Sequence, residues 1–186
     1  MFVRYRTGWL LLLALVLFPG PPPVHAGFSE IEVKAAFLFN FAHFTEWPPA
    51  TAPVARGELV IGIMGKDPFG PALRRFRGKT VGGVPVRIRR ISTPEEARRC
   101  HILYLSPSLK HRTRALVGLL QESPVLTVSD MQGFLERGGC IELMQIDHHI
   151  RFAVNLDRCR SAGLILRSNL LELARYVIMP EEDRHD

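Results

Sequence analysis

The sequence is short of the features that mark several specialised protein classes, and each shortage excludes one of them. Three cysteines in 186 residues are too few for a disulfide-dense mini-domain. Charged residues make up 23% and hydrophobic residues 47% of the chain, which excludes a disordered protein. The longest apolar run, Trp9–Phe18, spans about 15 Å as a helix, about half of a bilayer core. These limits leave a globular chain of one domain, or at most two small ones.

The N-terminal segment has the three parts of a secretory signal. Arg4 and Arg6 precede the apolar run, and the segment ends with the small residues Val24 and Ala26 at the −3 and −1 positions of a cleavage site. We expect residues 1–26 to be a cleaved signal peptide and residues 27–186 to be a single domain in the periplasm. A membrane anchor is the alternative, and the short apolar run disfavours it. Removal of the segment lowers the net charge from +6 to +4, because it carries two arginines and no acid.

The remaining basic residues do not indicate a nucleic-acid surface. The densest groups of arginines lie at 74–77 and 87–90, and no aromatic pattern of the kind that stacks on single-stranded bases is interleaved with them. No helix-turn-helix or zinc-finger spacing is present. We therefore expect a solvated basic surface and no nucleic-acid partner.

Residues 29–47 predict an aromatic helix. Ser29 and Glu32 form a capping-box pattern at its start, and Pro48 follows its end. The helix is apolar around most of its circumference, which leaves two interpretations open: a helix wedged into the core, or one that also forms a dimer or partner surface. The candidate interface residues are Phe37, Phe41, Phe44 and Trp47.

Strand and helix patterns alternate along the rest of the chain. Together they predict an α/β fold: a three-layer sandwich with a mostly parallel central sheet, helices on both faces and a C-terminal antiparallel hairpin. The expected strands are 59–64, 84–91, 100–105 and 125–128, and the expected hairpin joins 140–146 to 150–156 through 147–149. The expected helices are 71–76, a brief one from Pro94, 106–121, a short one ending at Arg137, and a last one from about 166 to 178.

A glycine-rich turn after the first strand is the candidate ligand site. In parallel sheets, ligands bind beyond the carboxyl ends of the strands, where backbone amides are free. The turn GKDPFG is neither GxGxxG nor a Walker A loop, so ordinary turn chemistry is the alternative interpretation. The candidate residues are Gly65, Lys66, Asp67, Phe69 and Gly70.

The sequence offers no assembled catalytic or metal-binding pattern. GxSxG, HExxH and SxxK are all missing, and we expect no enzyme activity, no metal and no cofactor. His101 lies in a strand and is interpreted as a satisfied core residue. His148 and His149 are adjacent in a turn, where two side chains rarely chelate one metal. Asp130 is explained as a helix cap.

The expected export bears on whether the three cysteines form a disulfide. An oxidising compartment favours one disulfide and one remaining thiol, and the three pairings 100–140, 100–159 and 140–159 are all open. We prefer Cys140 with Cys159, because the hairpin brings residue 140 back beside residues 156–157. Cys100 begins an interior strand and is expected to be a buried thiol.

The chain resembles the YfiR family of small periplasmic proteins over residues 31–177. The resemblance lies in the order and spacing of several segments rather than in any one of them. These are VKAAFLFNFAHFTEWP (33–48), GKDPFG (65–70), GKTVGGVPVRIRRI (78–91), CHILYLS (100–106), PVLTVSD (124–130), GGCIELM (138–144), IRFAVNL (150–156) and AGLILRSNLLELAR (162–175).

The resemblance implies an exported α/β protein without catalysis of its own. Family members dimerise in the periplasm and repress a membrane-bound diguanylate cyclase, which lowers cyclic di-GMP and restrains biofilm formation. The family also occurs beside sensor kinases and receptors, so a small-molecule-binding sensor module is the alternative function. Relatives often carry a cysteine in the first strand that can pair with the one in the CHIL segment; this strand reads LVIGIMG, so Cys100 lacks that partner.

Overall fold

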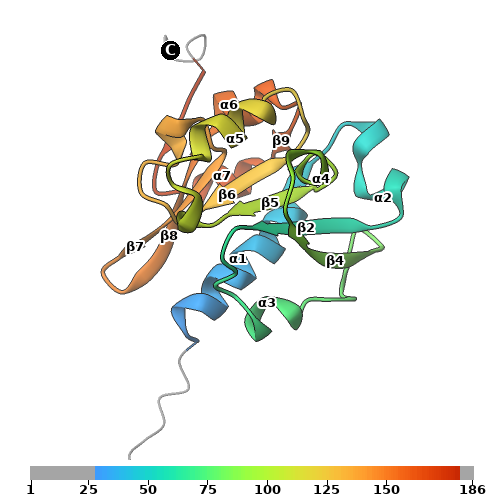
Figure 1. The fold of residues 1–186 in the computed structure, drawn as a ribbon, viewed down its shortest axis with the longest axis horizontal. Coiled ribbons are helices and arrows are strands. Elements are labelled where there is room, and N and C mark those ends of the chain that lie inside the picture. Colours follow the sequence, from blue (N-terminus) through green and yellow to red (C-terminus); the bar gives the residue numbers. More distant parts are fainter. Residues whose placement is uncertain (1–27, 181–186) are drawn as a thin grey trace, which may run out of the picture.

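A computed structural model describes residues 28–180. The predicted signal peptide and most of the C-terminal tail lie outside the described residues. Eight strands form the main sheet in the order β10-β8-β7-β6-β5-β2-β4-β3, with helices on both faces (Figure 1). The strands are β2 (Leu59–Met64), β3 (Thr80–Val81), β4 (Val84–Ile91), β5 (Ile102–Leu105), β6 (Leu126–Ser129), β7 (Ile141–Ile146), β8 (His149–Asn155) and β10 (Val177–Ile178).

The sheet is parallel except at two pairs. β7 and β8 form an antiparallel hairpin, and β3 pairs antiparallel with β4, whereas the other neighbouring strands are parallel. The predicted mostly parallel sheet with a late hairpin is therefore confirmed. A two-stranded sheet joins β1 (Thr45–Glu46) to β9 (Ile165–Leu166).

The helices are mostly short. Only α1 (Glu30–Phe44) is longer than two turns, and its Ser29–Glu32 capping box is present as predicted. The others are α2 (Pro53–Arg56), α3 (Pro71–Arg74), α4 (Pro94–Ala97), α5 (Thr113–Leu119), α6 (Leu156–Ser161) and α7 (Ser168–Glu172), with 3-10 turns η1 (Pro49–Thr51), η2 (Pro107–Leu109) and η3 (Leu135–Arg137).

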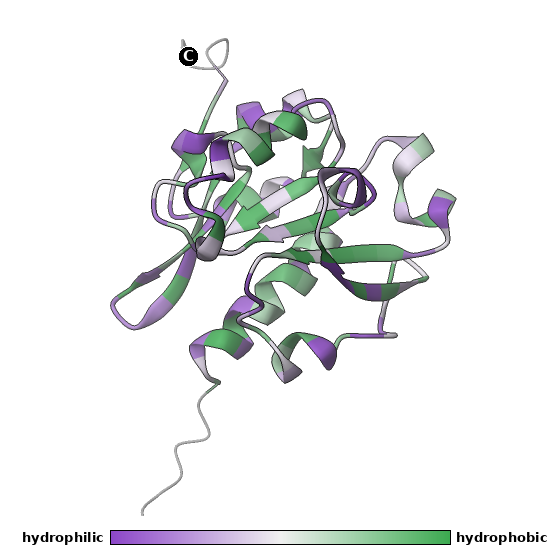
Figure 2. Ribbon diagram, viewed as in Figure 1, coloured by the Kyte–Doolittle hydropathy of each residue, from purple (hydrophilic) through white to green (hydrophobic). Residues whose placement is uncertain are grey.

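Alternation along the central strands gives the domain two apolar layers, and the central strands are largely hydrophobic in Figure 2. Leu59, Ile61 and Ile63 of β2 belong to the cluster that includes α1, α3 and α7. Val60 and Met64 of the same strand belong to the cluster that includes α4 and α5. A strand that is buried on both faces reads as a continuous apolar run, which is why LVIGIM predicted an interior strand.

Three helix predictions were too long. The expected helix at 106–121 divides into η2 and α5, and the one ending at Arg137 is reduced to η3. The expected helix at 166–178 is replaced by β9, α7 and β10. In this segment the backbone amides bond to distant segments rather than within a helix. Arg167 N–H donates to Phe44 C=O (3.0 Å), and Arg175 N–H donates to Phe152 C=O (2.7 Å).

Candidate functional site

The GKDPFG turn lies at the carboxyl end of β2, as predicted. Gly65 has φ +88° and Gly70 has φ +48°, so both occupy the region that favours glycine. Gly65 also packs against the turn after β5, since a Cβ atom there would lie 2.7 Å from Ser108 Oγ. A side chain at residue 65 would therefore disturb both the turn and its neighbour.

The turn uses its own polar groups to hold its shape. Lys66 N–H donates to Ser108 Oγ (3.0 Å), and Asp67 Oδ1 accepts from the amides of Phe69 (2.8 Å) and Gly70 (3.3 Å). The Phe69 ring is buried and packs edge-on against Tyr104, with ring centroids 4.7 Å apart. These three amides are already paired, so they do not form a cradle for an anion.

An open hollow of about 590 Å³ lies between the turn and the start of α1. Asp67, Phe69 and Gly70 line it, whereas Gly65 and Lys66 are not among its lining residues. An ion pair between Arg75 and Glu32 (3.0 Å) lies at the same place. The structure thus brings three of the five predicted ligand residues together around one hollow, and their role in binding stays a prediction.

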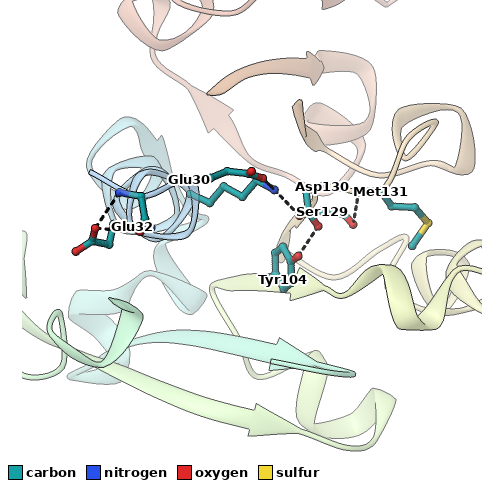
Figure 3. A network of polar contacts seen from close by, with 8 residues as sticks. Glu30, Glu32, Tyr104, Ser129, Asp130 and Met131 are labelled. Atoms are coloured by element: carbon teal, nitrogen blue, oxygen red, sulfur yellow. Dashed lines mark hydrogen bonds and ion pairs between the residues drawn. The ribbon is translucent and has the colours of Figure 1, made fainter. Parts of the chain in front are cut away.

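A polar network joins α1 to the carboxyl ends of β5 and β6 (Figure 3). Lys34 Nζ lies 2.6 Å from Asp130 Oδ2 and 2.5 Å from Glu30 Oε1, and the Tyr104 hydroxyl donates to Asp130 Oδ1. Burial and then the Asp130 carboxylate raise the pKa of Tyr104, so the phenol stays protonated. Although burial opposes it, hydrogen bonds to Asp130 and Glu30 raise the pKa of Lys34.

Sequence reasoning missed this network. It explained Asp130 as a helix cap and did not connect it with Lys34, since the two residues are 96 positions apart in the chain. The signal that could have found it is that parallel strands end at one edge of a sheet, where Tyr104 and Asp130 both lie. All four groups are engaged with one another, so the network fixes α1 over the strand ends and holds no free base or nucleophile.

The aromatic face of α1 packs mainly into the core. Phe41 and Trp47 are buried, and Phe37 and Phe44 keep part of their surface. Phe37 and Phe41 both contact Phe152 of β8, with centroids 5.5 and 5.3 Å apart. The core interpretation therefore accounts for Phe41 and Trp47 in the monomer, while an interface role for the four residues stays a prediction.

All three cysteines are free thiols and buried in this structure. Cys140 and Cys159 lie side by side, and a hydrogen bond from the Cys159 thiol lowers the pKa of Cys140 against the effect of burial. That hydrogen bond and burial raise the pKa of Cys159. Cys100 is separate, and burial raises its pKa to about 12. The two cysteines that were predicted to pair, Cys140 and Cys159, are thus neighbours, and the disulfide between them stays a prediction.

His101 is a paired core residue, as interpreted from the sequence. Its Nδ1 accepts from Val60 N–H (2.9 Å), and its Nε2 lies 3.0 Å from Thr51 C=O, which it reaches as a donor. Burial and the neighbouring Arg56 charge lower the pKa of His101 to about 4. The ring therefore stays neutral near pH 7 and joins β2 to η1.

The described residues contain neither a metal cluster nor a membrane-spanning helix. Within residues 28–180, no three His, Cys, Asp or Glu side chains are placed to hold a metal ion. No helix in the same range is both long and apolar enough to cross a bilayer.

Comparisons with known proteins agree with the fold. The profile of the family described as DUF4154, YfiR/HmsC-like, matches residues 31–175. No curated protein sequence matches the chain. A crystal structure of a conserved domain protein from Vibrio cholerae O1 biovar El Tor superimposes with a TM-score of 0.58 at 9% identity, covering 81% of this chain and 60% of that one. At this identity the likeness supports the fold alone, and the chain spans three fifths of the Vibrio protein.

A second solved structure shows a weaker likeness. It is the ABC domain in complex with L-Trp from Streptococcus pneumoniae, with a TM-score of 0.46 and 12% identity, covering 64% of this chain and 55% of that one.

Proposed function

This chain belongs to the YfiR/HmsC-like family, whose members are periplasmic regulators associated with diguanylate cyclases, and on that premise we propose that it represses such a cyclase. It binds the periplasmic part of the membrane-bound enzyme and lowers the output of cyclic di-GMP. The observation that carries the proposal is the family match over residues 31–175, which spans nearly all of the described domain.

The arrangement of the titratable groups supports a binding role rather than catalysis. Lys34 forms an ion pair with Asp130, Tyr104 donates its hydroxyl hydrogen to the same carboxylate, and His101 is bonded to two backbone groups. A nucleophile and a base within reach of each other and of an open cavity would be needed for hydrolysis, and these residues do not provide them.

Export and self-association belong to the same proposal. The mature protein begins near Gly27, it acts as a homodimer, and the Cys140–Cys159 disulfide forms in the periplasm. The partly exposed side chains of Phe37 and Phe44 on α1 support a contact surface on that helix, and the adjacent thiols support the pairing.

Crosslinking in intact cells tests the proposal. A tagged copy with a photoreactive amino acid at residue 44 is irradiated, and captured membrane proteins are identified by mass spectrometry. Placement of the same amino acid at Arg114, an exposed residue of α5, is the matched control. A diguanylate cyclase captured from residue 44 and not from 114, with cyclic di-GMP rising when the gene is deleted, is the expected result. A captured kinase or receptor with unchanged cyclic di-GMP contradicts it.

A small-molecule sensor is the second candidate function. The hollow of about 590 Å³ beside Asp67 favours it, because an acid and the Arg75–Glu32 pair lie around an open space. A thermal-shift screen with nucleotides and amino acids tests it. A rise in melting temperature that Arg75→Ala abolishes supports a site there, and the absence of any shift contradicts it.

A further inference from the structure

The edge of the main sheet has a notch beside the β7–β8 hairpin, which projects from the domain (Figure 1). β10 pairs only with the far end of β8, at Val154 and Asn155, and the chain approaches it through Arg175. The first residues of β8 therefore have no strand beside them on the outer side within the described part of the chain. A hollow of about 370 Å³ lies at this place, and Arg151, Arg175 and Leu173 are among the residues that line it.

The backbone of Ile150 faces the notch. Asp147 and His148 form a two-residue turn with φ of 48° and 61°, which makes Ile146 and His149 a hydrogen-bonded pair. The backbone groups of every second residue of β8, counted from Ile150, consequently face outward, and further along the strand they bond to residues 175 and 176. At Ile150 no outer backbone partner occurs among residues 28–180. An unpaired strand edge of this kind is a template for another strand.

The walls of the notch carry unneutralised positive charge. Arg151 and Arg175 are exposed, and neither forms an ion pair within residues 28–180. Some other exposed arginines do form ion pairs, such as Arg167 with Glu46 at 3.0 Å. One acid, Asp147, lines the hollow from the turn. The notch therefore favours a ligand that brings carboxylates to the two arginines.

The two faces of β8 differ in chemistry at this edge. Alternation along the strand directs His149 and Arg151 to one face and Ile150 to the other. A second hollow of about 600 Å³ opens beside Ile150, Phe28 and Phe37, and Glu30, His149 and Arg151 line it as well. A strand added beside β8 alternates in the same way, so its side chains next to His149 and Arg151 meet positive charge. The side chain between them lies on the Ile150 side, where Phe28 and Phe37 supply apolar surface.

We propose that this notch docks an extended segment of the partner protein, in which acidic residues flank an apolar one, as a strand added to β8. The inference rests on the proposed function, because it specifies the chemistry of the segment through which the partner is bound. A second copy of this chain is a poor occupant. Antiparallel pairing of two β8 edges about Ile150 would place Arg151 of each copy opposite His149 of the other. It would also add two more arginines and only one more acid, Asp147.

Binding of a defined peptide by the purified mature protein tests the docking site. The probe is an acetylated and amidated heptapeptide, Thr-Val-Glu-Val-Glu-Val-Thr, and the control peptide has lysine at both glutamate positions. Amide chemical shifts should move at residues 149–152 and 175 with the acidic peptide only, and the affinity should fall as salt rises. Arg151→Glu and Arg175→Glu should each weaken binding about tenfold or more, and Arg114→Glu on α5 should leave it unchanged.

Ile150→Pro tests the strand geometry separately from the charge. It removes one outward N–H that the β7–β8 hairpin does not use, so circular dichroism should remain native while peptide binding is lost. Shifts that map elsewhere, equal binding of the lysine peptide, or equal loss with Arg114→Glu would overturn the proposal. A purified dimer that becomes a monomer with Arg151→Glu would instead identify a second copy as the occupant and overturn it too.

Failure here is distinguishable from failure of the proposed function. If the peptide does not bind but deletion of the gene still raises cyclic di-GMP, the protein regulates the cyclase through another surface. If the peptide binds and Arg151→Glu abolishes binding without changing cyclic di-GMP, the notch serves a different partner and the cyclase assignment of this site is wrong.

Discussion

Gly62 in the middle of β2 occupies the position that faces the Cys100 thiol, and Gly62→Ala is a sharp test of how the interior is packed. A Cβ atom at residue 62 would lie 2.5 Å from Cys100 Sγ and 2.7 Å from Ile91 Cγ1. Both neighbours are buried, at 2% and 7% exposure, so neither can move into solvent. The added methyl group therefore forces a shift of the strand or of these side chains.

The expected cost follows from overpacking. Extra methylenes in a packed core destabilise by about 1–3 kcal/mol, and the entropy that alanine removes from the unfolded chain offsets about 0.4–1 kcal/mol of that cost. Gly62→Ala should consequently lower the free energy of unfolding by about 1–2 kcal/mol. Gly118 in α5 is the matched control, because a Cβ there meets no atom within 4 Å; Gly118→Ala should stabilise by about 0.5–1 kcal/mol.

A double-mutant cycle in urea attributes the cost to the thiol. Cys100→Ala removes the sulfur and should restore part of the stability lost in Gly62→Ala, with an interaction energy of about 1 kcal/mol. The restoration is partial because the contact with Ile91 persists. Unchanged stability of Gly62→Ala, or strictly additive costs in the double variant, would refute this description of the interior.

Three further results are expected. Non-reducing peptide mapping of periplasmic protein should find Cys140 bonded to Cys159 and residue 100 unmodified; a disulfide that includes residue 100 would show the pairing to be wrong. The lowered pKa of His101, about 4 against an ordinary 6.5, means that the unfolded chain binds the proton more readily, so stability should fall by up to about 3 kcal/mol as pH drops from 7 to 4. His101→Gln should flatten that part of the stability profile, and an unchanged slope would contradict the assignment. Glu142→Gln should lower the free energy of unfolding by about 1–3 kcal/mol, because this buried carboxylate accepts hydrogen bonds from the amides of residues 133–135. Hydrogen exchange at these three amides should become faster, and exchange rates equal to those of the native protein would contradict the prediction.

The sheet could be predicted from the sequence because each central strand carries its own signal. LVIGIM and CHILYL are short apolar runs, and VPVRIRRI alternates, so the type of each element follows from a local pattern. The end of the chain could not be predicted in this way. Its leucines at 166, 170 and 173 suit a helix, but Thr45 and Val154 draw its two ends into sheets.

In the candidate site, too, some features follow from the local sequence and others depend on distant contacts. The turn at residues 65–70 was found from its glycines and proline, and its position at the end of a parallel strand followed from the fold class. The pairing of Asp67 with the amides of Phe69 and Gly70 is local to the turn. The position of the Phe69 ring beside Tyr104, in contrast, depends on a residue of another strand. The unpaired edge at Ile150 likewise depends on where β10 stops, and two residues of strand leave almost no pattern in a sequence.

The first helix completes the domain by contacts with the last third of the chain. Lys34 reaches Asp130, Phe37 packs on Phe152, and Thr45 pairs with Leu166. None of these partners exists while the N-terminal half alone has been synthesised. Phe39 can already stack on Phe76 at that stage, but Phe37 and Phe41 lack Phe152 until the chain is nearly complete. Such long-range closure slows folding. A chain with this topology acquires its final shape only after residue 166 has been synthesised.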